Sequence, residues 1–113
     1  MSETITWDDF EKVELKIGTV VRAEEFPEAR KRAYKVWVDF GGEIGVKQTS
    51  AQVTVHYTPE TLVGTQVLGC VNLGEKNIAG FRSEFLLLGF ADEQQAICLA
   101  TTKTNAPNGA RME

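Results

Sequence analysis

The chain has 113 residues, and its 12 Lys and Arg against 16 Asp and Glu give a formal net charge of −4. This length supports one domain spanning residues 1–113, and the negative charge argues against a protein that coats nucleic acid through charge alone. No apolar run approaches the ~20 residues that cross a bilayer, and the first residues lack a signal-peptide pattern, so we expect a cytoplasmic protein without membrane insertion.

The first predicted element is a short helix over residues 6–12. Thr6 is a suitable N-cap, and two aspartates follow it in the first turn, where the positive end of the helix dipole favours them. A helix this short does not persist alone, so its apolar side chains must pack on the domain core or on a second copy of the chain. We predict a homodimer whose interface includes Ile5, Trp7 and Phe10.

Three strands are expected next, because apolar and polar residues alternate. The first covers residues 13–23, where Gly18 predicts a bulge or a sharp bend. The second covers residues 34–40, and the third lies near residues 44–48. Gly41 and Gly42 close the hairpin between them.

The second half of the chain adds a helix and three strands. Thr58 caps the helix, Pro59 takes its first position and Gly64 ends it. Apolar runs at residues 67–71, 85–88 and 96–99 predict the strands. This order indicates an all-β fold: a five-stranded β-barrel of the OB type, with a short helix before the first strand and another between strands 3 and 4.

Alternation also predicts which side chains lie outside strands 2 and 3, the face on which OB folds bind extended ligands. Lys35, Trp37 and Lys47 fall on that face. An aromatic ring flanked by lysines suits a stacked base and its phosphates. The alternative is that Trp37 lies under a loop or in a dimer contact.

The segment before strand 2 is basic and carries Arg30, Lys31 and Arg32. Such a run is either a solvated loop or a local patch that attracts an anionic partner. The sequence leaves both interpretations open.

A polar, glycine-bearing segment over residues 72–84 connects two apolar strands. Loops on a rigid scaffold commonly carry binding groups. This segment combines cations, an aromatic ring and a hydroxyl, but it has no paired nucleophile and base. The residues are Lys76, Phe81, Arg82 and Ser83. The segment therefore predicts a binding surface rather than an active site.

The residue types argue against an enzyme, because the sequence offers no triad, metal-ligand set or phosphate loop. His56 is the single histidine and there is no CxxC pair, so we predict no metal and no cofactor. We expect His56 in a loop or at a helix edge. Cys70 and Cys98 lie in apolar runs and are expected to be buried thiols, with a disulfide or redox pair as the alternative.

Several motifs resemble, in order, the tRNA-binding OB domain that occurs as a free-standing dimer and in some aminoacyl-tRNA synthetases. The matching segments are residues 13–20 (VELKIGTV), 25–31, 38–41, 57–60, 62–64, 71–73 and 80–84 (GFRSE). Residues 45–52 (GVKQTSAQ), 77–81 and 107–109 are more similar to the CsaA branch of that family, the export-related chaperones. The resemblance covers residues 6–112.

The resemblance implies an OB barrel that pairs as a homodimer and binds tRNA, extended or unfolded polypeptide, or both. Carried over by motif, Asn72 lies at the turn after strand 4, and Ser83 begins the serine-containing signature of strand 5. Both are implied ligand residues.

Two functions remain open. The first is a CsaA-like, export-related chaperone that binds non-native or precursor polypeptide and also tRNA. The alternative is a dedicated tRNA-binding protein without chaperone activity. The departures from the family's tRNA-binding consensus at Gly74, Glu75, Phe85 and Leu86 favour the first, as does the negative charge.

Overall fold

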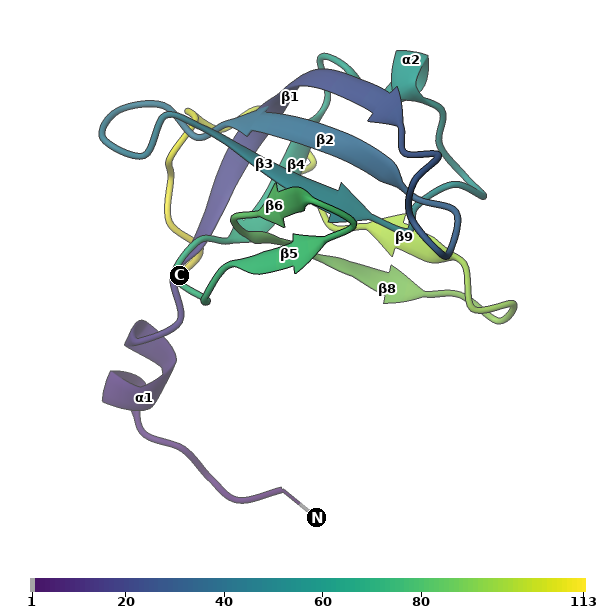
Figure 1. Cartoon of the computed structure of the whole chain (residues 1–113). Helices are drawn as coiled ribbons and strands as arrows, with labels where there is room; N and C mark the ends of the chain where they lie inside the picture. The colour runs from purple at the N-terminus through teal and green to yellow at the C-terminus, as the bar shows by residue number, and fades with distance from the viewer. Residues whose placement is uncertain (1) are drawn as a thin grey trace.

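The computed structural model describes residues 2–113 and shows a barrel made mostly of strands (Figure 1). One antiparallel sheet has the order β3-β2-β1-β4-β7, with β1 (Leu15–Glu25), β2 (Tyr34–Asp39), β3 (Val46–Ala51), β4 (Gln66–Cys70) and β7 (Leu86–Leu87). Two hairpins pair β5 (Lys76–Ile78) with β6 (Phe81–Ser83) and β8 (Gly89–Ala91) with β9 (Ile97–Leu99). Helix α1 (Trp7–Glu11) precedes β1, and α2 (Pro59–Leu62) lies between β3 and β4. The predicted OB-type barrel with two short helices is confirmed.

Strand β1 is long because it pairs with β2 over one part of its length and with β4 over another. Its register against β2 shifts between Val20 and Arg22, so the bulge lies there rather than at Gly18, where we predicted a bulge or a sharp bend. Gly18 has a different role: a Cβ atom at this position would lie 2.6 Å from Val38 Cγ1. The missing side chain therefore lets the core side chains of β2 pack directly against β1.

Strand β2 supplies the centre of the core. Tyr34, Val36 and Val38 are buried and alternate with half-buried residues, and Phe40 continues the buried series, as the periodicity predicted. The rings of Phe40 and Phe85 meet edge to face, with centroids 5.1 Å apart. Further core side chains come from β1, β4, α2 and the segment after β3, namely Val20, Val67, Leu62 and Val53.

The barrel closes where β3 meets residues 84–85. Glu84 donates its backbone N–H to the Gln48 carbonyl at 2.8 Å, and the Gln48 N–H donates to the Glu84 carboxylate at 3.0 Å. The buried Thr49 donates its hydroxyl to the Phe85 carbonyl at 2.7 Å. These bonds fix the segment that follows β6 on the barrel.

Residues 72–84, which we expected to form a glycine-bearing polar loop, instead contain the paired strands β5 and β6. Ala79 and Gly80 both have positive φ, 49° and 83°, as a two-residue type I′ turn requires. The Asn77 side chain accepts a hydrogen bond from the Gly80 N–H at 2.9 Å and stabilises this turn. The prediction was wrong because an alanine in the first turn position gives no hairpin signal in the sequence.

Helix α1 stands away from the barrel (Figure 1). Thr6 caps it as predicted and forms a capping box with Asp9. Trp7 is 83% exposed and Ile5 is 62% exposed, whereas Phe10 is half-buried. Packing of Trp7 on the chain's own core, one of the two alternatives, is thereby excluded. Within residues 2–113, neither helix has the length and apolar character needed to span a membrane.

The two cysteines differ in exposure. Cys70 is a buried free thiol, as predicted, but Cys98 is an exposed free thiol, so that part of the prediction was wrong. Strand β9 explains the difference, because Ile97 and Leu99 are half-buried while Cys98, between them, faces outward. His56 lies in the turn before α2, where the sequence placed it.

Candidate functional site

An open groove of about 890 Å³ lies on one side of the barrel. Its walls come from residues 29–33 before β2, residues 50–53 at the end of β3, residues 77–79 at the tip of the β5–β6 hairpin, and residues around β7 to β9. Much of the lining is aliphatic, including Val53, Ile78, Leu86, Leu87 and Ile97. A groove of this size with an aliphatic lining can accommodate an extended ligand.

Two strands with unpaired edges contribute to the groove. In the described part of the chain, β5 pairs only with β6 and β8 only with β9. Asn77 and Ile78 of β5 and Gly89 of β8 line the groove. An unpaired edge exposes backbone N–H and C=O groups that an added strand can bind.

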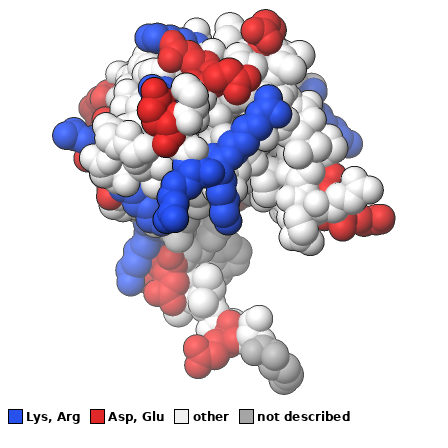
Figure 2. Space-filling view, turned by 45° about the vertical axis from the view of Figure 1, so that its right-hand side comes forward, with Lys and Arg blue, Asp and Glu red and all other residues white. Residues whose placement is uncertain are grey.

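The basic segment forms a cationic rim on the groove. Arg30 and Lys31 both line it, are exposed, and have no acidic partner within residues 2–113. Arg32 instead lies 3.7 Å from the Glu25 carboxylate. Figure 2 shows Lys and Arg side chains gathered near the middle of one face, with Asp and Glu side chains beside them. The protein therefore carries local positive charge despite its acidic balance.

Trp37 and Lys35 are half-buried on β2 and contact other side chains. The Trp37 ring meets Phe81 edge to face, with centroids 5.8 Å apart, and the Arg22 guanidinium lies 4.4 Å from its centre. The Lys35 ammonium lies 4.9 Å from the centre of the Phe26 ring and 5.2 Å from that of Phe81. Trp37 therefore lies under the β5–β6 hairpin, the alternative that the sequence left open, and a base can stack on it only if Arg22 or Phe81 moves.

Asn72 and Ser83 both make internal hydrogen bonds. Asn72 accepts from the Glu14 N–H at 2.9 Å and donates to the Lys12 carbonyl at 2.6 Å, which ties the start of β1 to the end of β4. Ser83 Oγ accepts from the Ser50 N–H at 3.1 Å and ties β6 to β3. These bonds assign each side chain a structural role, and its role in ligand binding stays a prediction.

Lys47, Lys76 and Arg82 do not line the groove. Lys47 is half-buried on β3, and Lys76 is exposed on β5. Arg82 Nε lies 3.5 Å from the Glu75 carboxylate. The structure thus brings Arg30 and Lys31 of the predicted cations to the groove. Arg32 stays in the segment before β2, and the others lie on the β5–β6 hairpin and the main sheet.

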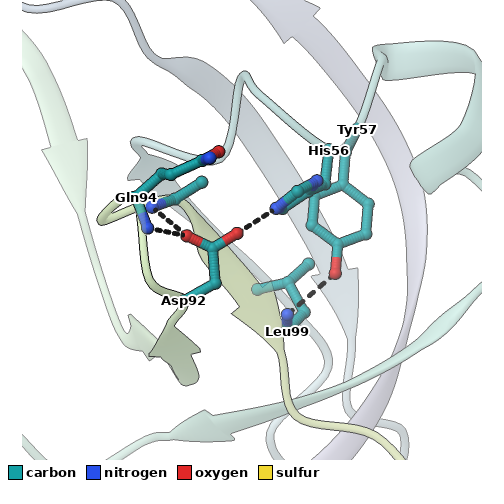
Figure 3. A network of polar contacts seen from close by, with 6 residues as sticks. His56, Tyr57, Asp92, Gln94 and Leu99 are labelled. Atoms are coloured by element: carbon teal, nitrogen blue, oxygen red, sulfur yellow. Dashed lines mark hydrogen bonds and ion pairs between the residues drawn. The ribbon is translucent and has the colours of Figure 1, made fainter.

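A separate polar cluster joins the turn before α2 to the turn between β8 and β9 (Figure 3). His56 Nε2 lies 2.7 Å from Asp92 Oδ2, while Asp92 Oδ1 accepts from the N–H groups of Gln94 at 2.8 Å and Ala96 at 3.0 Å. The His56 hydrogen bond, with those from Ala96 and Gln94, lowers the pKa of Asp92 below its ordinary value. The Cys98 sulfur lies within 4.8 Å of the facing His56 and Asp92 atoms. These three residues are the set within residues 2–113 that could hold a metal ion.

Sequence reasoning missed the apolar lining of the groove. We assigned the leucines at 86–88 to a core strand, yet Leu86 is 48% exposed, and Ile78, 36% exposed, fell in the supposed polar loop. The run of leucines at 86–88 was the available signal. Successive residues of a strand point to opposite faces, so at least one of these leucines had to face away from the core.

Comparison with known proteins identifies the family. The family model described as "Putative tRNA binding domain" matches residues 15–111. The methionine–tRNA ligase of Methanococcus aeolicus is 38% identical over 95 residues, which cover 84% of this chain and 14% of the ligase. The chain therefore spans only a small part of the length of this curated relative.

Two solved structures match almost the whole chain. The chaperone CsaA from Bacillus anthracis has a TM-score of 0.90 and 43% identity, covering 98% of this chain and 100% of that chain. The CsaA chaperone protein from Picrophilus torridus has a TM-score of 0.88 and 35% identity, covering 97% of this chain and 100% of that chain. Together with the family model, these matches confirm the resemblance seen in the sequence: the chain belongs to the tRNA-binding domain family and, within it, to the CsaA branch.

Proposed function

We propose that this chain is a homodimeric, CsaA-like protein that holds extended, non-native polypeptide in the groove and also binds tRNA. The groove carries the proposal, because it combines an aliphatic lining with two unpaired strand edges. Its role is binding rather than catalysis. An export-related chaperone of this kind would meet precursor polypeptides, and tRNA, in the cytoplasm.

An extended polypeptide satisfies both features of the groove. Its backbone can pair with the edge of β5 or β8, and its alternate apolar side chains can pack on residues such as Ile78 and Leu86. Pairing through the backbone requires no particular sequence, which suits a protein that holds many different unfolded chains. Arg30 and Lys31 at the rim would attract acidic segments of such chains.

Dimerisation is supported by the exposed apolar side chains around α1. Trp7 and Ile5 stand in solvent, and Val13, Leu73 and Met112 are also 43–51% exposed. A second hollow, of about 200 Å³, is lined by Ile17, Leu68, Ala106, Ala110 and Met112, among others. We propose that the aromatic side chains of a partner's α1 pack on this surface. A dimer presents two grooves, which raises its avidity for a long unfolded chain without any new contact.

Binding of tRNA is the second candidate function, and the family model together with the exposed Arg30 and Lys31 favours it. We propose that phosphates contact the cations on the groove rim and on β3 and β5. The same cations would serve a dedicated tRNA-binding protein without chaperone activity. A variant with a charge in the aliphatic lining, Leu86→Asp, therefore distinguishes the two functions.

Suppression of aggregation tests the polypeptide-binding proposal. A several-fold excess of the protein should reduce the light scattering of a thermally unfolding client, and Leu86→Asp should abolish most of the effect by placing a charge in the aliphatic lining. Val63→Asp is the matched control, because Val63 is equally exposed, at 48%, but does not line the groove. Absence of suppression by the wild type, or equal suppression by both variants, would contradict the proposal. If tRNA binding then remained, the dedicated tRNA-binding protein would be the better account.

A further inference from the structure

Three side chains with different metal-binding atoms meet on the outer side of the β8–β9 hairpin. His56 comes from the turn before α2, Asp92 from the turn between β8 and β9, and Cys98 from β9 itself. The imidazole nitrogen, the carboxylate oxygen and the sulfur lie within 4.8 Å of one another. All three are accessible, since His56 and Cys98 are exposed and Asp92 is half-buried.

We propose that His56, Asp92 and Cys98 form a binding site for a borderline-soft divalent metal ion, with Zn²⁺ as the best match. Thiolate, imidazole and carboxylate are together the ligand types that Zn²⁺ uses, whereas Ca²⁺ and Mg²⁺ favour oxygen ligands alone. Three protein ligands leave the fourth tetrahedral position to water or to an external ligand.

The structure already holds two of the ligands in place. Asp92 Oδ1 is occupied by the N–H groups of Gln94 and Ala96, which leaves Oδ2 directed at His56, as Figure 3 shows. Hydrogen bonds of this kind orient a metal-binding carboxylate and are a regular part of zinc sites. The residue after His56 is also fixed, because the Tyr57 hydroxyl accepts from the Leu99 N–H of β9 at 2.8 Å.

Only small movements are needed to complete the site. In a tetrahedral site with bonds of about 2.0–2.3 Å, ligand atoms lie roughly 3.3–3.7 Å apart. The 2.7 Å contact between His56 and Asp92 must therefore open slightly, and the Cys98 sulfur must approach by up to about 1 Å. Rotation of the exposed Cys98 side chain provides that approach without moving the strand.

Sequence spacing predicted no metal site, because the three residues belong to separate segments and only the fold brings them together. The site would also connect to the groove. Two other side chains of this hairpin, Gln95 and Ile97, line the groove, so a bound ion would link the back of one groove wall to the turn that carries His56.

Titration of the tag-free, reduced and metal-stripped protein with Zn²⁺ alone, followed by calorimetry, tests the proposal. One ion should bind per chain, and Co²⁺ in its place should give the intense near-ultraviolet band of a cobalt–thiolate bond. His56→Ala and Cys98→Ser should each weaken binding at least about tenfold, and Cys98→Ser should remove the band. Asp92→Asn, which keeps an oxygen for the Gln94 and Ala96 N–H groups, should weaken binding as well. Cys70→Ala is the control and should leave both signals unchanged.

Alkylation of the wild-type chain gives a readout that does not depend on any variant folding. Zn²⁺ should slow the reaction of Cys98 with a thiol reagent, and prior alkylation should prevent Zn²⁺ binding. Three results would overturn the proposal: no Zn²⁺ binding at millimolar concentration, binding that Cys98→Ser leaves unchanged, or no protection of Cys98.

Discussion

Ion pairing within this chain limits how steeply the proposed binding of tRNA can depend on salt concentration. Each phosphate contact contributes roughly 0.7–0.9 to the slope of log affinity against log salt. The predicted phosphate-binding cations number seven and are Arg30, Lys31, Arg32, Lys35, Lys47, Lys76 and Arg82. If all seven released counterions, a rise from about 50 to about 200 mM salt would weaken binding roughly 10³-fold or more.

The structure reduces the number of cations that are available to contact phosphates. Arg32 and Arg82 each lie near a glutamate, and Lys35 lies against two aromatic rings, so four of the seven remain free to contact phosphate. Four contacts give a slope of about −3 to −4 and a loss of roughly 50- to 150-fold over the same salt range. We therefore expect an intermediate salt dependence.

Fluorescence anisotropy of labelled tRNA at five or more salt concentrations measures the slope. Lys31→Gln should make the slope shallower by about 1, while Lys103→Gln, an exposed lysine outside the predicted set, should leave it unchanged. A slope near zero would refute binding through phosphates. A slope steeper than about −5 would refute the conclusion that the ion-paired cations do not contact phosphates.

Three further predictions concern the dimer, the hairpin and the core. Trp7→Ala should raise the dissociation constant of the proposed dimer at least about 30-fold in analytical ultracentrifugation, as loss of an aromatic hot spot does, with little change in the barrel's thermal midpoint; a monomeric wild type at micromolar concentration would contradict dimerisation. Phe81→Ala should shift the Trp37 emission to the red and lower the unfolding free energy by at least about 1 kcal/mol, because the edge-to-face contact between the two rings is lost together with the apolar area that it buries; unchanged emission would show that the hairpin does not cover the Trp37 ring. Gly18→Ala should cost about 1–3 kcal/mol in chemical denaturation through overpacking, whereas Gly74→Ala, with no atom within 4 Å of its added Cβ, should be near neutral; equal effects would argue against the close approach of β2 to β1.

The barrel was predictable because its strands follow simple rules. Tyr34, Val36 and Val38 alternate with polar or amphipathic residues, and the buried face of β2 is the one that this alternation indicates. The first residues of both helices were also predictable from the sequence, since Thr6 and Thr58 each form a capping box at the predicted position.

The groove was not predictable, because it depends on how separate segments pack. Its lining joins residues near 30, 50, 78 and 97, and no local pattern shows that these meet. Ile78 reaches the groove through the β5–β6 hairpin, which local turn signals did not reveal. Cys98 was misplaced for a related reason: a three-residue apolar strand does not show by itself which of its faces is buried.

Photo-cross-linking tests the polypeptide-binding groove most directly. A photoreactive phenylalanine analogue in place of Ile78, in the groove, should cross-link a non-native client, and Leu86→Asp should reduce the yield several-fold. The same analogue in place of Val63, outside the groove, should give little product. Equal yields at the two positions, or no product from the groove position, would contradict the account that extended polypeptide binds between the β5–β6 and β8–β9 hairpins.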